Sequence, residues 1–246
     1  MDYRTEMIEL VKKELNSPLV ILGFVEETSL GLLTSSYIIE SLNMHQIAQI
    51  RSRYIPPVTV FVGKKMRSPF RLYSNEAGDL LLVTCDVPVD PMGLHEVSSV
   101  LVDWLESKNA REVVVVEGIP VKGYPDDRTV YVAAEENNID KFLKKGLKSA
   151  ESAIIGGLGG AVINVSIGKR LNPVSVMAPA SITLQDPAAV LSIINVLNDI
   201  YDLKVNVEIL EESVNRLNEE IKKIMDQYAK MQLPKSGKDN EPPIYG

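Results

Sequence analysis

The sequence is poor in the residues that most often carry catalysis or metal binding. It has one cysteine and two histidines in 246 residues. One cysteine cannot form an internal disulfide, which fits a reducing cytosol. Cys85 stands in an apolar run, where we expect a small buried side chain rather than a nucleophile. His45 and His95 have no second histidine or cysteine at metal-ligand spacing, which argues against a zinc site.

Concentrated positive charge and long apolar runs are also missing. The formal net charge is -7 and no block of Lys and Arg stands out, which argues against nucleic acid or an anionic membrane as the main partner. No apolar run reaches membrane-spanning length and no signal peptide is visible, so we expect a cytoplasmic protein. No Gly-x-Ser-x-Gly elbow exists to position a serine nucleophile. We therefore expect no enzymatic activity, cofactor or metal.

Strand and helix patterns alternate over residues 1–206. Continuous apolar runs predict strands buried on both faces of a sheet, and amphipathic segments separate them. The alternation predicts one α/β domain with a doubly wound, mainly parallel sheet flanked by helices. Strands are expected at 19–25, 58–62, 70–73, 79–86, 113–116, 130–133, 154–155 and 174–177, and helices at 3–15, 32–42 (N-cap Ser29), 94–107, 139–147, 161–167 and onward from 187 (N-cap Asp186).

A further amphipathic helix is expected over residues 207–232. Its apolar residues step alternately by four and three, which is a heptad seam. Two interpretations stay open: the seam joins copies of the chain into a homo-oligomer, or it packs on its own domain. In both, the helix is a rigid arm. The seam residues are Leu210, Val214, Leu217, Ile221, Ile224 and Tyr228.

A glycine-rich turn, Ile155 to Gly160, precedes a predicted helix. Such a turn can hold a phosphate at the helix N-terminus. The dinucleotide fingerprint would need a glycine where Val162 stands, and no Gly-Lys-Ser/Thr run exists, so close backbone packing explains the glycines at least as well. Strand-end acids form a second candidate site, for which we favour turn formation and solubility over catalysis. These acids are Asp86, Asp90, Glu117, Asp126 and Asp127.

The last segment, residues 233–246, has no periodic apolar pattern and is predicted to be a disordered tail. It ends with Pro242 and Pro243 followed by Ile244, Tyr245 and Gly246. The prolines favour an extended backbone, which lowers the entropy cost of docking. An aliphatic residue, a tyrosine and a free carboxylate suit a C-terminal recognition peptide, although a tail could also end this way by accident.

Several motifs together resemble the proteasome assembly chaperone family, in particular its archaeal members. They are Gly23-Phe24 ending the first predicted strand, Gly31 opening the first helix, Glu117-Gly118 after a buried strand, the turn from Ile155 to Gly160, and Asp186-Pro187-Ala188-Ala189 opening a late helix. The resemblance implies a nucleoside phosphorylase-like fold without catalytic residues and a homo-oligomer that works without ATP. It also implies that Ile244 and Tyr245 enter pockets between proteasome α subunits, while the carboxylate of Gly246 pairs with a lysine there.

The sequence therefore favours an ATP-independent proteasome assembly chaperone or activator. Its expected partners are the proteasome α subunits and further copies of itself, and whether a related chaperone subunit also takes part stays open. The main alternative is a phosphate- or nucleotide-binding enzyme of nucleoside phosphorylase-like fold that uses the turn from Gly156 to Gly160. A third hypothesis is a passive scaffold that oligomerises through the seam.

Overall fold

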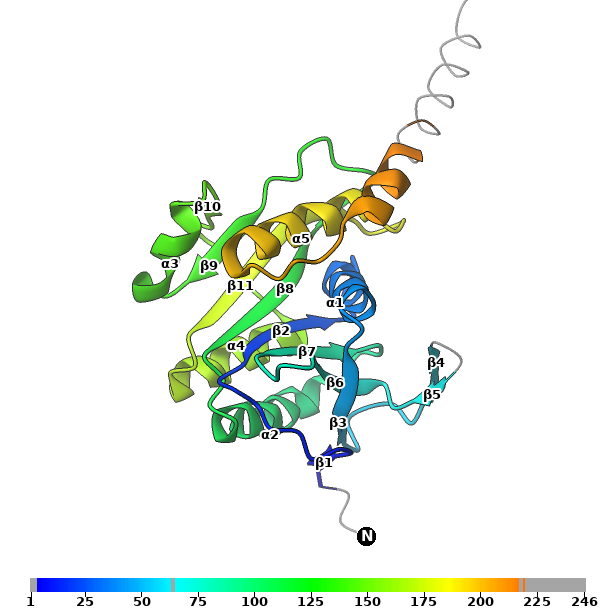
Figure 1. Ribbon diagram of the computed structural model, residues 1–246, viewed down its shortest axis with the longest axis vertical. Helices are drawn as coiled ribbons and strands as arrows, with labels where there is room; N and C mark the ends of the chain where they lie inside the picture. The colour runs from blue at the N-terminus through cyan, green and yellow to red at the C-terminus, as the bar shows by residue number, and fades with distance from the viewer. Residues whose placement is uncertain (1–3, 63–64, 217–218, 220–246) are drawn as a thin grey trace, which may run out of the picture.

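The computed structural model describes residues 4–62, 65–216 and 219, and its centre is a nine-stranded sheet with helices on both faces (Figure 1). The strand order is β1-β3-β6-β7-β2-β8-β11-β9-β10. Within this described part of the chain, no helix combines the length and the apolar character that crossing a membrane requires.

Four parallel strands form the middle of the sheet. In spatial order they are β7 (Leu80–Cys85), β2 (Leu19–Phe24), β8 (Glu112–Val121) and β11 (Pro173–Ser181). Every residue of β2 and β7 is buried, because helices cover both faces of the sheet and exclude water from each. The predicted α/β class is confirmed.

The margins of the sheet are mostly antiparallel. On one side β6 pairs with β7, β3 pairs with β6 and β1 pairs with β3, all antiparallel. On the other side β9 pairs antiparallel with β11, and β10 is a short parallel edge strand. The bounds of these strands are β1 Glu6–Glu9, β3 His45–Arg51, β6 Phe70–Ser74, β9 Tyr131–Ala134 and β10 Lys148–Ser149.

Two helices cover each face of the sheet. On one face, α1 (Leu30–Ser41) and α5 (Pro187–Tyr201) share a buried core with alternate residues of the central strands. On the other face, α2 (Leu94–Ser107) and α4 (Gly157–Lys169) share a second core with the remaining residues. A shorter helix, α3 (Glu136–Leu143), contacts β9 and β10, and a 3-10 turn, Pro91–Gly93, precedes α2.

The helix predicted for residues 3–15 is wrong. Residues 6–9 form β1, in which Glu6 lies opposite Arg51 and Glu9 opposite Ala48 on β3. Leu10 and Val11, which supplied part of the helical pattern, are 48% and 54% exposed. Backbone pairing along the edge of the sheet therefore outweighs the local spacing of apolar residues.

The strand predicted at 58–62 lies outside the main sheet. Val60–Val62 (β4) pairs only with Lys65–Arg67 (β5), in a separate two-stranded sheet. The predicted strand at 154–155 is also wrong, since those residues have no strand structure and Ile154 is 99% exposed. A two-residue apolar pair cannot hold a strand without a neighbouring ladder to pair with.

Of the two predicted helix N-caps, Asp186 makes a capping hydrogen bond and Ser29 does not. The Asp186 Oδ1 atom accepts the Ala189 N–H at 3.1 Å at the start of α5, as expected. Ser29 stands at the N-cap position of α1, but its side chain makes no capping hydrogen bond. Thr28 caps this helix instead, because its Oγ1 atom accepts the Leu30 N–H at 3.2 Å.

The structure describes only part of the helix predicted over residues 207–232. Residues 208–216 are helical (Figure 1). Leu210, the first seam residue, is buried in the core that α1 and α5 share, so the seam begins by packing on its own domain. Val214 is half-buried. Leu217, Ile221, Ile224, Tyr228 and the tail 233–246 lie outside the described residues, and the seam's role in an oligomer stays a prediction.

Candidate functional site

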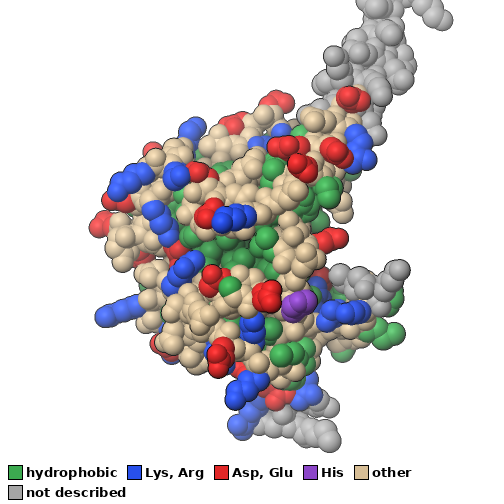
Figure 2. All heavy atoms as spheres, viewed as in Figure 1, with side chains coloured by type: hydrophobic (Ala, Val, Ile, Leu, Met, Phe, Trp, Pro, Cys, Tyr) green, Lys and Arg blue, Asp and Glu red, His purple; other side chains and the backbone are tan. Residues whose placement is uncertain are grey.

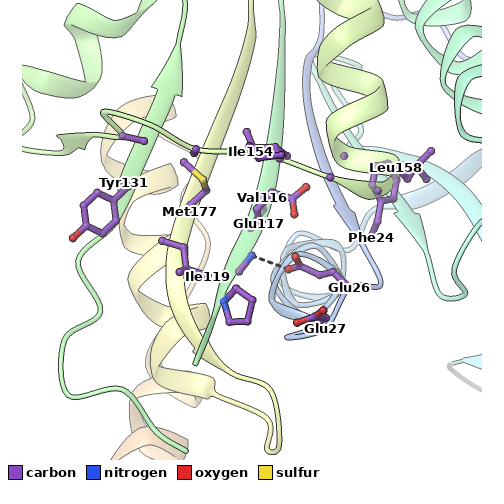
Figure 3. A pocket seen from close by; sticks show the side chains of 18 of the residues that line it. Phe24, Glu26, Glu27, Val116, Glu117, Ile119, Tyr131, Ile154, Leu158 and Met177 are labelled. Atoms are coloured by element: carbon purple, nitrogen blue, oxygen red, sulfur yellow. Dashed lines mark hydrogen bonds between the residues drawn. The ribbon is translucent and has the colours of Figure 1, made fainter. Parts of the chain in front are cut away.

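A large cavity lies at the carboxyl ends of β2 and β8, which are adjacent parallel strands (Figure 3). After β2 the chain forms β3, β6 and β7, which all lie on one side of β2 in the sheet. It then crosses to β8 on the other side of β2, so the strand order reverses at this point. In open α/β sheets, ligands bind in the crevice outside the carboxyl ends at such a reversal. The cavity measures about 1320 Å³, above the roughly 300–1,000 Å³ that is typical of small-molecule sites.

The walls of the cavity are mainly apolar. Phe24 ends β2, Val116 and Ile119 belong to β8, and Met177 reaches in from β11. Across from these strands runs the segment 148–159, which contains the exposed Ile154 and leads into α4 (Figure 3). A ligand with an apolar body would therefore bury surface against both walls.

Two carboxyl groups, Glu26 and Glu117, face the cavity and contact one another. Glu26 Oε1 accepts the Gly118 N–H at 2.8 Å, the Thr28 hydroxyl at 3.0 Å and the Gly31 N–H at 3.4 Å. These three hydrogen bonds fix the position of the Glu26 carboxyl group beside β8.

The second carboxyl group, Glu117, has a strongly raised pKa. Burial, the charge of Glu26 and the hydrogen bond between the two side chains together raise the pKa of Glu117 to about 9. Since like charges this close cannot both ionise near neutral pH, the pair holds one proton, and that proton lies on Glu117.

Glycines bring the backbone close around this pair. A Cβ on Gly118 would lie 1.9 Å from Thr28 Oγ1, and one on Gly159 would lie 1.9 Å from Glu117 Oε1. A Cβ on Gly31 would lie 2.4 Å from the Val116 carbonyl oxygen. Larger residues would push β8, α1 and α4 apart, so the glycines set the geometry of the carboxyl pair.

The structure brings together two features that the sequence singled out separately. Glu117 and the turn from Gly156 to Gly160 border the same cavity. Close packing accounts for part of the turn, because a Cβ on Gly160 would lie 2.1 Å from the Ile155 carbonyl oxygen, whereas Gly156 and Gly157 have open space around them. Glu26 was not identified as a site residue from the sequence, although Glu26 comes directly after the predicted buried strand that ends with Gly23-Phe24-Val25.

The cavity is poorly suited to phosphate. The Glu117 carboxyl lies against the first turn of α4, where an anion would have to approach the helix N-terminus. The lining contains one lysine, Lys148, and four glutamates, so its charge is mainly negative. The glutamates are Glu26, Glu27, Glu117 and Glu151. The described residues hold no group of three His, Cys, Asp or Glu that could bind a metal ion.

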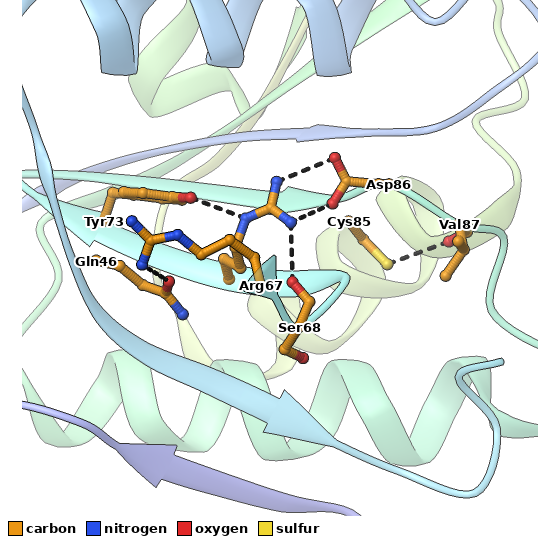
Figure 4. Close-up of polar contacts among 8 residues, drawn as sticks. Gln46, Arg67, Ser68, Tyr73, Cys85, Asp86 and Val87 are labelled. Atoms are coloured by element: carbon orange, nitrogen blue, oxygen red, sulfur yellow. Dashed lines mark hydrogen bonds and ion pairs between the residues drawn. The ribbon is translucent and has the colours of Figure 1, made fainter. Parts of the chain in front are cut away.

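Two of the other strand-end acids, Asp90 and Asp127, serve turns, as favoured from the sequence, whereas Asp86 forms an ion pair that the sequence did not predict. Asp90 Oδ1 accepts the Met92 N–H at 2.8 Å, and Asp127 Oδ1 accepts the Thr129 N–H at 2.9 Å. Asp86 binds the buried Arg71 through two hydrogen bonds of 2.5 and 3.0 Å (Figure 4). Cys85 beside it is buried, as predicted, and burial raises the pKa of its thiol to about 12.

We expect Glu117→Gln to stabilise the protein above pH 7. The ordinary pKa of this carboxyl is 4.5 and its folded pKa is about 9, so the unfolded chain loses this proton first as pH rises. The wild type then loses up to about 1.4 kcal/mol of unfolding free energy per pH unit between these values. Glutamine imitates the protonated carboxyl and removes this loss, a gain of about 2–4 kcal/mol at pH 8. Urea unfolding from pH 5 to 9 measures it.

The control for this measurement is Glu27→Gln, which changes an exposed carboxylate at the same cavity and should leave the pH dependence as in the wild type. At pH 5 the Glu117→Gln and wild-type proteins should differ little. Equal pH slopes for the two proteins between pH 6 and 9 would show that Glu117 ionises normally in the fold.

Comparison with known proteins gives the fold and the family. A structure from Thermoplasma acidophilum, described as a protein with unknown function, is 43% identical, covers 89% of this chain and 90% of its own, and has a TM-score of 0.77. Pyrococcus furiosus PbaA, described as an archaeal homolog of proteasome-assembly chaperone, is 20% identical over 93% of this chain and 94% of its own, with a TM-score of 0.81. Pyrococcus furiosus PbaB, described as an archaeal proteasome activator, is 18% identical over 91% and 99%, with a TM-score of 0.78.

The model of the PAC2 family matches residues 20–225, which is most of the chain and includes the whole cavity. The resemblance drawn from the sequence motifs is therefore confirmed, and the chain belongs to the PAC2 family.

Proposed function

We propose that this protein is a proteasome assembly chaperone or proteasome activator that works without ATP and without enzymatic activity. The observation that carries the proposal is membership in the PAC2 family, supported by the fold shared with PbaA and PbaB. The proposed partners are the proteasome α subunits, with homo-oligomerisation through further copies of this chain. Such a role would be carried out in the cytoplasm.

The proposed contact with the α ring is made by Ile244, Tyr245 and Gly246. Ile244 offers an apolar anchor, Tyr245 an aromatic ring with a hydroxyl, and Gly246 a carboxylate. Pro243 restricts the backbone before them, which reduces the entropy lost on docking. A tripeptide buries little surface, so several tails displayed on one oligomer would bind far more tightly than one alone.

The segment that leads towards the tail starts from a fixed point on the domain. Asn198 on α5 holds Val205 through two hydrogen bonds of 3.0 Å, one to its N–H and one to its carbonyl. The Tyr37 hydroxyl on α1 donates to the Asn206 carbonyl oxygen at 2.9 Å, and Leu210 is buried beside these helices. The following helix therefore leaves the domain in a set direction (Figure 1), which suits presentation of a binding peptide.

We expect Tyr245→Ala, and deletion of residues 244–246, to reduce binding to the proteasome core particle by about 100-fold, equal to about 2.7 kcal/mol. The loss follows because the aromatic anchor of each tail is removed and the effect repeats over every copy in the oligomer. Interferometry with immobilised core particle measures the affinity, and light scattering checks that the oligomer is unchanged.

A matched control in the same tail is Ser236→Ala, which should bind like the wild type. Adding two residues after Gly246 should also weaken binding, because it moves the carboxylate away from Tyr245. Unchanged affinity for Tyr245→Ala would refute the tail as the contact, and equal affinity for the extended chain would refute the role of the carboxylate.

A further inference from the structure

The cavity between β2, β8 and α4 is independent of the proposed tail contact, and its chemistry points to a ligand. Its walls are apolar, as Phe24, Val116 and Met177 show, and it holds two acidic side chains that touch one another. A carboxyl pair in such surroundings costs stability near neutral pH, since one group must stay protonated to avoid repulsion. A fold that only needed to close this end of the sheet could use apolar side chains here without that cost.

The charges around the pair favour a cation over an anion. The titratable and charged groups that line the cavity are Glu26 and Glu27 after β2, Glu117 on β8, Tyr131 on β9, Lys148 on β10, and Glu151 in the segment before α4. Four of these six are acids and one is a lysine. The N-terminus of α4, which besides Lys148 would attract an anion, already has the Glu117 carboxyl against it.

The positions of the Glu26 and Glu117 carboxyl groups favour a planar cation with several N–H donors. Glu26 Oε1 is fixed by the backbone N–H groups of Gly118 and Gly31 and by Thr28, while Glu117 contacts Glu26 from the neighbouring strand. A planar group with several N–H donors can bridge two such carboxylates through charge-assisted hydrogen bonds. Its apolar body would then lie between Met177 on the sheet and the segment 148–159.

We propose that this cavity binds a small organic cation of the amidine or guanidine class with an apolar body, held by Glu26 and Glu117. On binding, the ligand's N–H groups take the place of the Glu117 proton, which leaves to solvent. Charge is conserved, because the pair changes from one negative charge to two while the bound cation adds one positive charge.

Benzamidine is the probe, since it stays protonated across the useful pH range and carries an aromatic body. Isothermal titration calorimetry on the full chain at pH 6, 7, 8 and 9 should show affinity rising by up to about tenfold per pH unit towards pH 9, with about one proton released at pH 7. Benzamide, the neutral analogue, should bind at least about tenfold more weakly. Benzoate and inorganic phosphate should not bind.

Three variants separate the roles of charge and space. Glu117→Gln should lose at least about tenfold in affinity for benzamidine together with the pH dependence, whereas Glu76→Gln, which changes an exposed acid outside the cavity lining, should change affinity by less than about twofold. Ala153→Trp, on the exposed part of the lining, should block the cavity while both carboxyls stay in place. Circular dichroism confirms that each variant is folded.

The proposal would be overturned by no benzamidine binding to the wild type, by equal binding of benzamide and benzamidine, or by a preference for benzoate or phosphate. Wild-type affinity in Glu117→Gln would do so as well. The chain lacking residues 244–246 should bind benzamidine normally, so failure of this site and failure of the tail contact can be told apart.

Discussion

Gly23→Ala is expected to prevent stable folding. A Cβ at this position on β2 would lie 1.8 Å from the Gly31 carbonyl oxygen and 2.4 Å from Ser35 Oγ, both on α1. The nearest atom belongs to helix backbone, so relief requires moving α1 away from the sheet. We expect a loss of about 4 kcal/mol or more, which is much of the stability of a typical domain. Soluble yield and the urea midpoint measure it.

Gly168→Ala is the matched control. Gly168 lies in α4 with no atom near its Cβ position and without a positive φ, so alanine should stabilise the helix by up to about 1 kcal/mol. If Gly23→Ala unfolded within 1 kcal/mol of the wild type, α1 would have room to move and the close packing would not limit this position.

The close approach at Gly23 also positions the cavity. With α1 held against β2, the loop between them is short and carries Glu26 to the end of β8, where it accepts the Gly118 N–H at 2.8 Å. Gly31 lets the same helix approach the Val116 carbonyl oxygen. The glycines that resemble the family pattern therefore have a shared physical role, which is to bring α1, β2 and β8 together beneath the carboxyl pair.

The centre of the fold could be predicted from the sequence because burial there produces a recognisable local pattern of apolar residues. Strands such as β2 and β7 are covered on both faces, so their sequences are continuous apolar runs. The helix expected at 94–107 has the bounds of α2. For α5, the capping Asp186 followed by Pro187 gave the start of the helix.

The margins of the sheet could not be predicted in this way. In β3, Ile47, Ala48 and Ile50 are buried, but His45, Gln46, Gln49 and Arg51 interrupt them, and no simple alternation remains. The structure has a register irregularity between Gln46 and Ala48 where β3 pairs with β6, which explains the lost alternation. For β1, pairing with β3 decides the structure, and the paired residues, from Glu9 with Ala48 to Glu6 with Arg51, are 39 to 45 positions apart in the chain.

The sequence could identify single parts of the candidate site but not how they come together. Glu117 and the glycine-rich turn stood out locally, but the partner of Glu117 is Glu26, 91 positions away, and a sequence pattern does not show which strand ends meet. The raised pKa of Glu117 depends on burial and on this distant carboxylate. Asp86 also differs from the expectation of turn formation and solubility, since its side chain pairs with the buried Arg71.

Asp86→Ala is expected to destabilise the protein by about 3–5 kcal/mol, because it leaves the Arg71 guanidinium buried without its counter-charge. The Arg71 side chain is 4% exposed, and its other partners are the Ser68 carbonyl and the Tyr73 hydroxyl, each at 2.8 Å (Figure 4). Burial tends to lower the pKa of Arg71, but its contacts with Asp86 and Tyr73 more than offset burial and raise that pKa. Arginine keeps its proton in proteins at ordinary pH, so Arg71 stays charged when Asp86 is removed. Urea unfolding at pH 7 measures the loss.

Asp199→Ala provides the comparison, because Asp199 pairs with Lys145 at 2.8 Å on the surface, where the two side chains are 55% and 47% exposed. Water already solvates that pair, so its removal should cost less than about 1 kcal/mol. The double variant Arg71→Met with Asp86→Ala should recover part of the stability lost in Asp86→Ala, since no unpaired charge remains buried. If Asp86→Ala cost no more than Asp199→Ala, water would have to reach Arg71, and the end of β7 would be more open than its packing indicates.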